Sequence, residues 1–191
     1  MDITPERYLI AFDASSVTIG YSIFSITKKE LVAISYYNLN STLVLDKADE
    51  FSNWLDGILN KYPLIDTAVL EKSFQAMFGG VSSIHTTTIL NQVNILYQYI
   101  CKKKGLQVNS MSVAECRKKA FPTVKLKPKK ISGGLNHKEQ MFNVVVGVLG
   151  KEMFPTKEMK SGRRKGEIVF VDEAKDMSDS YVVGLAYLNK K

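Results

Sequence analysis

The sequence has 191 residues, of which 45% are hydrophobic, and a formal net charge of +7. These values predict a single folded domain over residues 1–191, with a core of ordinary size. No apolar run approaches the roughly 18 residues of a membrane span, and "MDITPERY" lacks the basic end and apolar centre of a signal peptide. We therefore expect a protein of the bacterial cytosol, or of the host cytosol if a phage encodes it, without a membrane partner. Cys101 and Cys116 have no second pair or His nearby, so the sequence indicates neither a zinc knuckle nor a disulfide framework.

The first half of the chain predicts strands followed by a helix and a further strand. Residues 7–13, 18–27 and 30–39 are strand-like and joined by short turns, which predicts an antiparallel meander. From Asp46 the apolar positions recur at helical spacing as far as "KYP". The run "DTAVLE", residues 66–71, is typical of a strand buried on both faces.

The second half of the chain adds helices. The patterns predict a long helix over 82–104, a strand over 105–113, a short helix over 114–121, a longer one over 136–153, and a last helix in the second half of 168–191. The order of elements predicts an α/β domain with a mixed five-stranded sheet flanked by helices.

The charge is segregated along the chain. The segment from Arg117 to Lys165 holds 14 Lys or Arg and 3 Glu, which leaves 12 basic and 16 acidic residues elsewhere. Within it, the Lys-rich, Pro-rich and Gly-rich stretches near 122–135 and 155–167 predict mobile basic loops. A basic belt beside acidic segments favours a polyanionic partner, although such runs can also be ordinary solvated surface.

Four acids stand at the predicted ends of elements. Asp13 ends the first strand, Glu71 ends the fourth, and Asp176 and Asp179 begin the last helix at a spacing that puts them on one face. Sites in such sheets form where strand ends meet a helix terminus. Four carboxylates gathered there would repel one another unless cations intervened. Two Mg²⁺ ions about 3.5–4 Å apart would meet that need and serve phosphodiester cleavage.

Each acid also has an ordinary structural interpretation. Asp13 could form a turn, Glu71 could be a solvated strand end, and the last pair could cap a helix. Asp172 and Glu173 compete with that pair, because helical period does not decide which two acids in "VDEAKDMSD" point inward.

Three motifs together resemble the RuvC family of Holliday-junction resolvases. "YLIAFDASSVTIGYSIF" is similar to the family's first strand pair, "VLEKSF" to its second motif, and "DMSDSYVVGLAYL" to its closing motif. The resemblance implies a ribonuclease-H-like fold, a homodimer, and two Mg²⁺ ions per site that Mn²⁺ can replace. It also implies that four-way and related branched DNA is nicked to leave 5′ phosphates.

Carried onto this sequence, the resemblance implies roles for particular residues. The metal ligands would be Asp13, Glu71, Asp176 and Asp179. Lys119 and Lys138 would lie near the scissile phosphate, with Lys118 an almost equal candidate. Phe74 would stack on unpaired bases, unless it is a core residue, and the 82–104 helix would form the dimer contact. The expected DNA-binding residues are Phe74, Arg117, Lys118, Lys125, Lys127, Lys129, Lys130, Arg163 and Arg164.

Other functions stay open at this stage. The basic belt alone is compatible with a noncatalytic DNA-binding protein. "FDASSVTIGYS" also resembles the phosphate-binding start of actin-like ATPases, but 191 residues leave no room for the second copy that they contain, so no nucleotide cofactor is expected. Pre-ribosomal-RNA processing factors are a further alternative. The Lys, Asn, Ile and Tyr bias and the long basic segment over 151–172 favour a phage-encoded member, similar to those of lactococcal phages.

Overall fold

The computed structural model describes residues 5–72 and 84–190, and these contain a mixed five-stranded sheet. Its strands lie in the order β3-β2-β1-β4-β5. The antiparallel meander and the parallel pairing of β1, β4 and β5 confirm the predicted sheet. The strands are β1 (Tyr8–Ala14), β2 (Thr18–Ser25), β3 (Glu30–Asn38), β4 (Ile65–Glu71) and β5 (Gln107–Met111).

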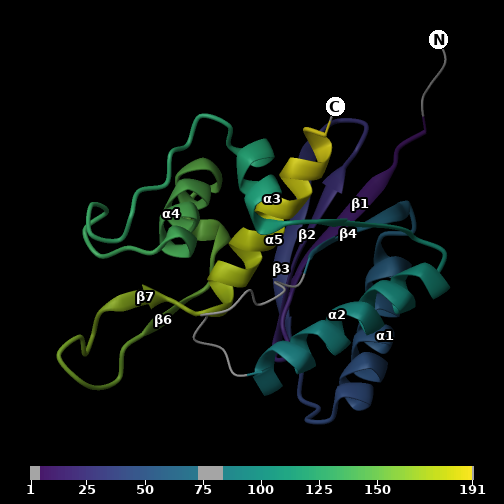
Figure 1. Cartoon of the computed structure of the whole chain (residues 1–191), viewed down its shortest axis with the longest axis horizontal. Coiled ribbons are helices and arrows are strands. Elements are labelled where there is room, and N and C mark those ends of the chain that lie inside the picture. The colour runs from purple at the N-terminus through teal and green to yellow at the C-terminus, as the bar shows by residue number, and fades with distance from the viewer. Residues whose placement is uncertain (1–4, 73–83, 191) are drawn as a thin grey trace.

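Helices cover both faces of this sheet (Figure 1). One face carries α1 (Val44–Lys61) and α2 (Ile84–Lys103), and the other carries α5 (Glu173–Leu188), against which α3 (Val113–Ala120) and α4 (His137–Leu149) pack. None of the helices in the described ranges combines the length and hydropathy that crossing a bilayer requires.

The α4 helix is shorter than its sequence pattern predicts. It ends at Leu149 instead of continuing to residue 153, because Gly150 adopts a φ of 91°, which lies outside the helical region. A short 3-10 turn, η1 (Lys151–Met153), follows.

The two sides of β1 serve two separate cores. Ile10 and Phe12 are buried against the α1 and α2 side, whereas Leu9 and Ala11 are buried against the side of α3, α4 and α5. Successive side chains of a strand point to opposite faces. Asp13 is therefore directed to the same side as Leu9 and Ala11, beneath α5.

The second predicted loop is wrong in part. Instead of a loop throughout 155–167, the chain forms an antiparallel hairpin from β6 (Thr156–Glu158) and β7 (Ile168–Phe170), with residues 159–167 between them. Strands of three residues are too short to show an alternating pattern. The hairpin forms because Phe170 and Phe154 pack edge-to-face on Phe142 of α4, with ring centroids 5.0 and 5.5 Å away.

The first predicted loop is irregular in the structure, as the sequence indicates. It is nevertheless attached to α4. The backbone N–H of Lys127 donates to Gln140 Oε1 at 2.8 Å, and Gln140 Nε2 donates to the carbonyl of Lys127 at 2.8 Å. Both basic segments, the 121–136 loop and the β6–β7 hairpin, thus project from α4, one on either side of it in Figure 1.

Candidate active site

Two acids meet at one edge of the sheet because β1 and β4 are parallel neighbours. Phe12 pairs with Leu70 in the register, so Asp13 and Glu71 come next on adjacent strands. Both strands present their carboxyl ends at this edge, where open α/β sheets commonly form binding sites. The strand period places Glu71 on the same face as Val69, which belongs to the core beneath α5.

The α5 helix delivers the other two acids because it approaches β2 closely. Gly20 is the partner of Asp13 in the β1–β2 register, and a Cβ atom at this position would overlap the backbone carbonyl of Asp176. Further along, the hydroxyl of Ser22 donates to the carbonyl of Ser180 at 2.9 Å within the buried interface. The first turns of α5 therefore lie directly over the end of β1.

Lys138 stands among three of the acids. Its Nζ atom is 2.9 Å from Asp176 Oδ1, 2.9 Å from Asp179 Oδ2 and 3.6 Å from Asp13 Oδ2. The lysine belongs to the first turn of α4, where Asn136 and Glu139 form a reciprocal capping box. The helix start is thus fixed, and only the lysine side chain extends to the carboxylates.

The pKa values in this carboxylate cluster (Asp13, Glu71, Asp176 and Asp179) reflect burial first and repulsion between like charges second. Burial raises the pKa of Glu71 to about 7, and the nearby Asp179 adds to the shift. Burial and the charge of Asp179 raise the pKa of Asp13 well above its usual value. Burial also raises the pKa of Asp179, although Lys138 opposes the shift. Burial disfavours the ammonium of Lys138, but the surrounding carboxylates raise its pKa. Burial is the main cause of each raised carboxyl pKa and repulsion between the acids adds to it, so a further cation at the site would lower these pKa values.

Arg117 on α3 is a second cation at this site. Its guanidinium lies near enough to lower the pKa values of both Glu71 and Asp179. The sequence assigned Arg117 to DNA binding and gave the place near the acids to Lys119. In the structure Lys119 pairs with Glu115 on the same helix at 2.9 Å, and Lys118 is exposed without a described ion pair. A buried Cys116 could have indicated which face of α3 points inward. The sequence does not show, however, that the carboxylate cluster lies opposite the face that carries Arg117.

The competing acids on α5 do not join the cluster. Asp172 precedes the helix, its side chain is 89% exposed, and it pairs with Lys175. Glu173 accepts a hydrogen bond from Asn38 Nδ2 at 3.4 Å. By contrast, the side chains of Asp176 and Asp179 are only 23% and 12% exposed. Phe74 lies outside the described residues.

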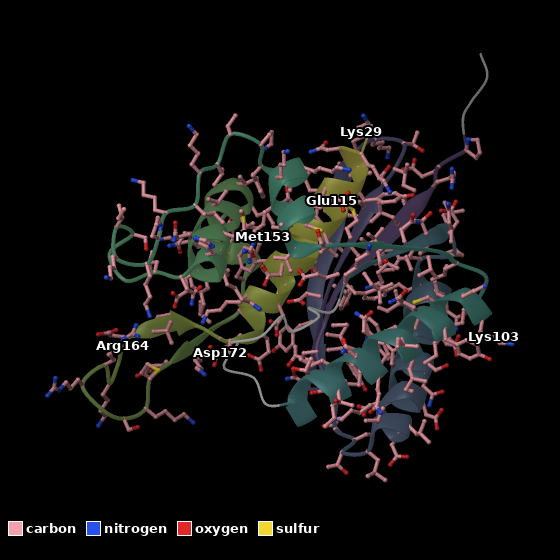
Figure 2. All side chains as sticks on the ribbon, in the orientation of Figure 1. Lys29, Lys103, Glu115, Met153, Arg164 and Asp172 are labelled. Atoms are coloured by element: carbon pink, nitrogen blue, oxygen red, sulfur yellow. The ribbon has the colours of Figure 1, made fainter. Side chains whose placement is uncertain are left out.

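The remaining predicted DNA-binding residues lie on the two basic segments. Lys125, Lys127, Lys129 and Lys130 are exposed along the 121–136 loop. Figure 2 shows Arg164 at the outer end of the hairpin and Asp172 where the hairpin joins α5. Arg164 pairs with Glu167 at 2.6 Å, whereas exposed Arg163 has no ion pair among the described residues.

The donor chemistry of the cluster suits a hard cation. Carboxylate oxygens are the ligands that Mg²⁺ prefers, and three acids already direct an oxygen to one cationic group, Lys138. As the described side chains stand, no three His, Cys, Asp or Glu residues among them are spaced to hold a metal ion. Asp13, Asp176 and Asp179 instead surround the ammonium group of Lys138.

Solved structures similar to this chain clarify its fold. RuvC of Thermus thermophilus, in complex with a Holliday-junction substrate, matches with a TM-score of 0.61 and 9% identity over 96% of this chain and 93% of that one. The chain has the ribonuclease-H-like fold. Another Thermus thermophilus RuvC structure matches with a TM-score of 0.55 and 10% identity, over 95% of this chain and 93% of that one. The yeast mitochondrial Holliday junction resolvase Ydc2 matches with a TM-score of 0.56 and 14% identity, over 98% of this chain and 80% of that one.

Sequence comparison adds no family to this structural result. No family model matches the sequence, and no curated protein is significantly similar to it. At identities of 9 to 14% the structural likeness carries the ribonuclease-H-like fold alone. The chemistry of the site must therefore be argued from the side chains at the sheet edge.

Proposed function

We propose that this chain is a Mg²⁺-dependent, structure-selective endonuclease that nicks four-way (Holliday) and related branched DNA. The observation that carries the proposal is the carboxylate cluster, in which acids far apart in the sequence surround a single cationic group at the sheet edge. The ribonuclease-H-like fold supports it, as does the likeness to a RuvC that was solved with a Holliday-junction substrate.

Asp13, Glu71, Asp176 and Asp179 would hold the divalent ions, two per site, with Mn²⁺ able to replace Mg²⁺. When bound, such ions activate a water molecule and stabilise the leaving 3′ oxygen, so that the nick leaves a 5′ phosphate. Arg117 and Lys138 stand beside the acids and would position the scissile phosphate and oppose the negative charge that develops on it.

The two basic segments would hold the DNA on either side of the site. Both are attached to α4, the loop through Gln140 and the hairpin through Phe142, and the same helix carries Lys138. Their cations would contact phosphates, which would give binding that is independent of base sequence and sensitive to salt.

A homodimer is part of the proposal because a four-way junction has two-fold symmetry and needs two sites for symmetric cleavage. The α2 helix exposes Ile95 and Tyr99, whose side chains lie one helical turn apart and are 66% and 56% exposed. Such a stripe is suited to contact with a second copy. Sedimentation of the wild type and of Ile95→Glu would test it, with a shift from dimer to monomer expected.

Cleavage of labelled DNA tests the main proposal. We expect the wild type with Mg²⁺ to nick a four-way junction, and Asp13→Asn or Asp179→Asn to lose at least a factor on the order of 10²–10³ in rate while still binding the junction. Junction binding without nicks in the wild type would favour the noncatalytic DNA-binding alternative. Turnover of ATP would favour the actin-like alternative, and cleavage restricted to RNA would favour the ribosomal-RNA processing alternative.

A phage origin is a separate proposal. It is supported by the Lys, Asn, Ile and Tyr bias and by the basic hairpin segment. Genes for phage replication or packaging beside the coding sequence would bear it out, and a cellular recombination operon there would contradict it.

A further inference from the structure

The position of Lys138 has a consequence for metal loading. Its ammonium occupies the space between the carboxylates of α5 and the end of β1, with oxygens of Asp176 and Asp179 both 2.9 Å away. On the basis of the proposed function, we propose that Lys138 is a tethered counter-ion that a divalent ion must displace before it can bind. The lysine would thus set the metal affinity of the site.

The two cations exclude each other because they need the same oxygen atoms. A Mg²⁺ ion holds its oxygen ligands at about 2.0–2.1 Å, closer than any hydrogen-bonded ammonium. An ion ligated by Asp176 Oδ1 and Asp179 Oδ2 would therefore lie against the Lys138 amine and be repelled by it. The ion can bind the oxygens only once the amine has left them.

The side chain of Lys138 can move away from the carboxylates while α4 stays in place. The start of α4 is held by hydrogen bonds of 2.9 and 2.8 Å between Asn136 and Glu139. The Lys138 side chain is 40% exposed and consists of a flexible stem with a compact charge at its end. Once released, the amine would be free to contact a DNA phosphate, which links metal loading to substrate binding.

Calorimetric titration of Mn²⁺ into the DNA-free protein tests the exchange directly. The variant Lys138→Met keeps an unbranched side chain as far as Cε and removes the charged amine, and we expect it to bind Mn²⁺ on the order of tenfold more tightly than the wild type. Lys104→Met is the matched control, because Lys104 pairs with Asp56 at 2.6 Å on the opposite side of the sheet. It removes the same charge and should leave Mn²⁺ affinity unchanged. Equal or weaker binding by Lys138→Met would overturn the inference.

A second measurement uses the unaltered protein and does not depend on a variant that folds. Amines held by carboxylates react slowly with acylating reagents, so labelling of Lys138, read by mass spectrometry, should rise several-fold when Mg²⁺ is added. Labelling of Lys104 should stay constant. Protection of Lys138 by Mg²⁺, or no change, would contradict displacement.

The Mn²⁺ titration also distinguishes a failure of this inference from a failure of the proposed function. Asp13→Asn and Asp179→Asn should each weaken Mn²⁺ binding strongly. If both variants weaken Mn²⁺ binding but Lys138→Met does not strengthen it, the proposed ion site is supported and only the displacement of Lys138 is wrong. If neither carboxylate variant affects Mn²⁺ binding, the ion site of the proposed function is wrong, and with it the exchange.

Discussion

Acids on the two faces of the central sheet have different surroundings, and their pKa values shift in opposite directions. On the α1 and α2 side, Glu50 has donors of its own: it accepts hydrogen bonds from Tyr37, Asn40 and Ser41. Although burial opposes the shift, these bonds lower the pKa of Glu50 to about 2. On the other side four carboxyl groups share the cations of Lys138 and Arg117, and the pKa of Glu71 rises to about 7.

This difference supports the second face as the place of the proposed function, although both faces contribute a buried core. A carboxylate with its own donors stabilises the native state, whereas gathered carboxylates without enough cations cost stability. Perturbed acids concentrated at one edge of a sheet are a mark of a functional site. The aromatic core on the first face can stabilise the fold while the second face keeps its charges close together.

The largest contrast between the faces should appear in stability. Phe51 is fully buried on the first face and stacks on Tyr97 with a centroid distance of 4.0 Å. We expect Phe51→Ala to lower the free energy of unfolding by about 3–5 kcal/mol, because it opens a cavity. Asp179→Asn should keep or raise that free energy at pH 8 in metal-free buffer, since it removes a repelling charge. Urea unfolding measures both, and equal losses in the two variants would contradict the contrast.

Substitutions at two glycines test the difference between the two faces at the level of the backbone. Gly20→Ala should lower the free energy of unfolding by about 1–3 kcal/mol and reduce nicking, because the new methyl group displaces Asp176 and its helix. Gly57→Ala on α1 is the control: its Cβ meets no atom within 4 Å, and helix propensity should stabilise the protein by up to about 1 kcal/mol. Unchanged stability and nicking in Gly20→Ala would show that α5 does not need this close approach.

The pH dependence of stability should have opposite signs on the two faces. The pKa of Glu71 is raised from 4.5 to about 7, so its contribution is fully present below about pH 4.5 and is lost as the pH rises towards 7. The pKa of Glu50 is lowered to about 2, so its contribution is present above about pH 4.5 and is lost as the pH falls towards 2.

Melting temperatures measured across pH in EDTA check these signs. Glu71→Gln should reduce the decline between pH 4.5 and 7, by an amount on the order of 2 kcal/mol or less, and the raised pKa values of Asp13 and Asp179 should account for any decline that is left. Glu50→Gln should flatten the loss of stability below pH 4.5. An undiminished decline between pH 4.5 and 7 in Glu71→Gln would contradict the role given to Glu71.

The smallest expected effect concerns the hairpin, which lies beyond the cluster on the second face. Lys160, Arg163 and Lys165 are exposed on its loop and have no ion pair among the described residues. Changing all three to Ala should reduce the slope of log affinity against log salt by up to about 0.9 for each DNA phosphate that is no longer neutralised. Nicking at saturating DNA should be unchanged. Changing Lys28, Lys29 and Lys61 to Ala is the control, because it removes the same charge from another part of the surface. An equal reduction of the salt slope in that variant would show a general effect of net charge.

Several features of the site follow from local sequence. Asp13 and Glu71 each end an apolar run, and parallel strands bring such ends to one edge, so their proximity could be predicted. The i, i+3 spacing of Asp176 and Asp179 likewise puts both on one helical face. The sequence does not decide which acids of that segment face inward, because all four lie close together at the start of one helix and period alone does not fix where the helix begins.

Other features could not be predicted because they depend on contacts between distant segments. Lys138 is separated from Asp13 by 125 positions and reaches it only because α4 lies beside α5. Arg117 and Lys119 are equivalent as charges, and only the docking of α3 decides that Arg117 faces the acids. The β6–β7 hairpin depends on aromatic contacts with Phe142 of α4 that its own short strands do not reveal.

The sequence by itself determined the strands of the central sheet, the helices around it, their order and the acids at their ends, because hydrophobic period and strand length are local properties of the chain. Tertiary structure alone decided how charge is balanced at the sheet edge: which two acids of α5 turn inward, and which lysine and arginine oppose them. Electrostatic energy depends on distance in space and on burial, and both are set only when β1, β4, α3, α4 and α5 pack together.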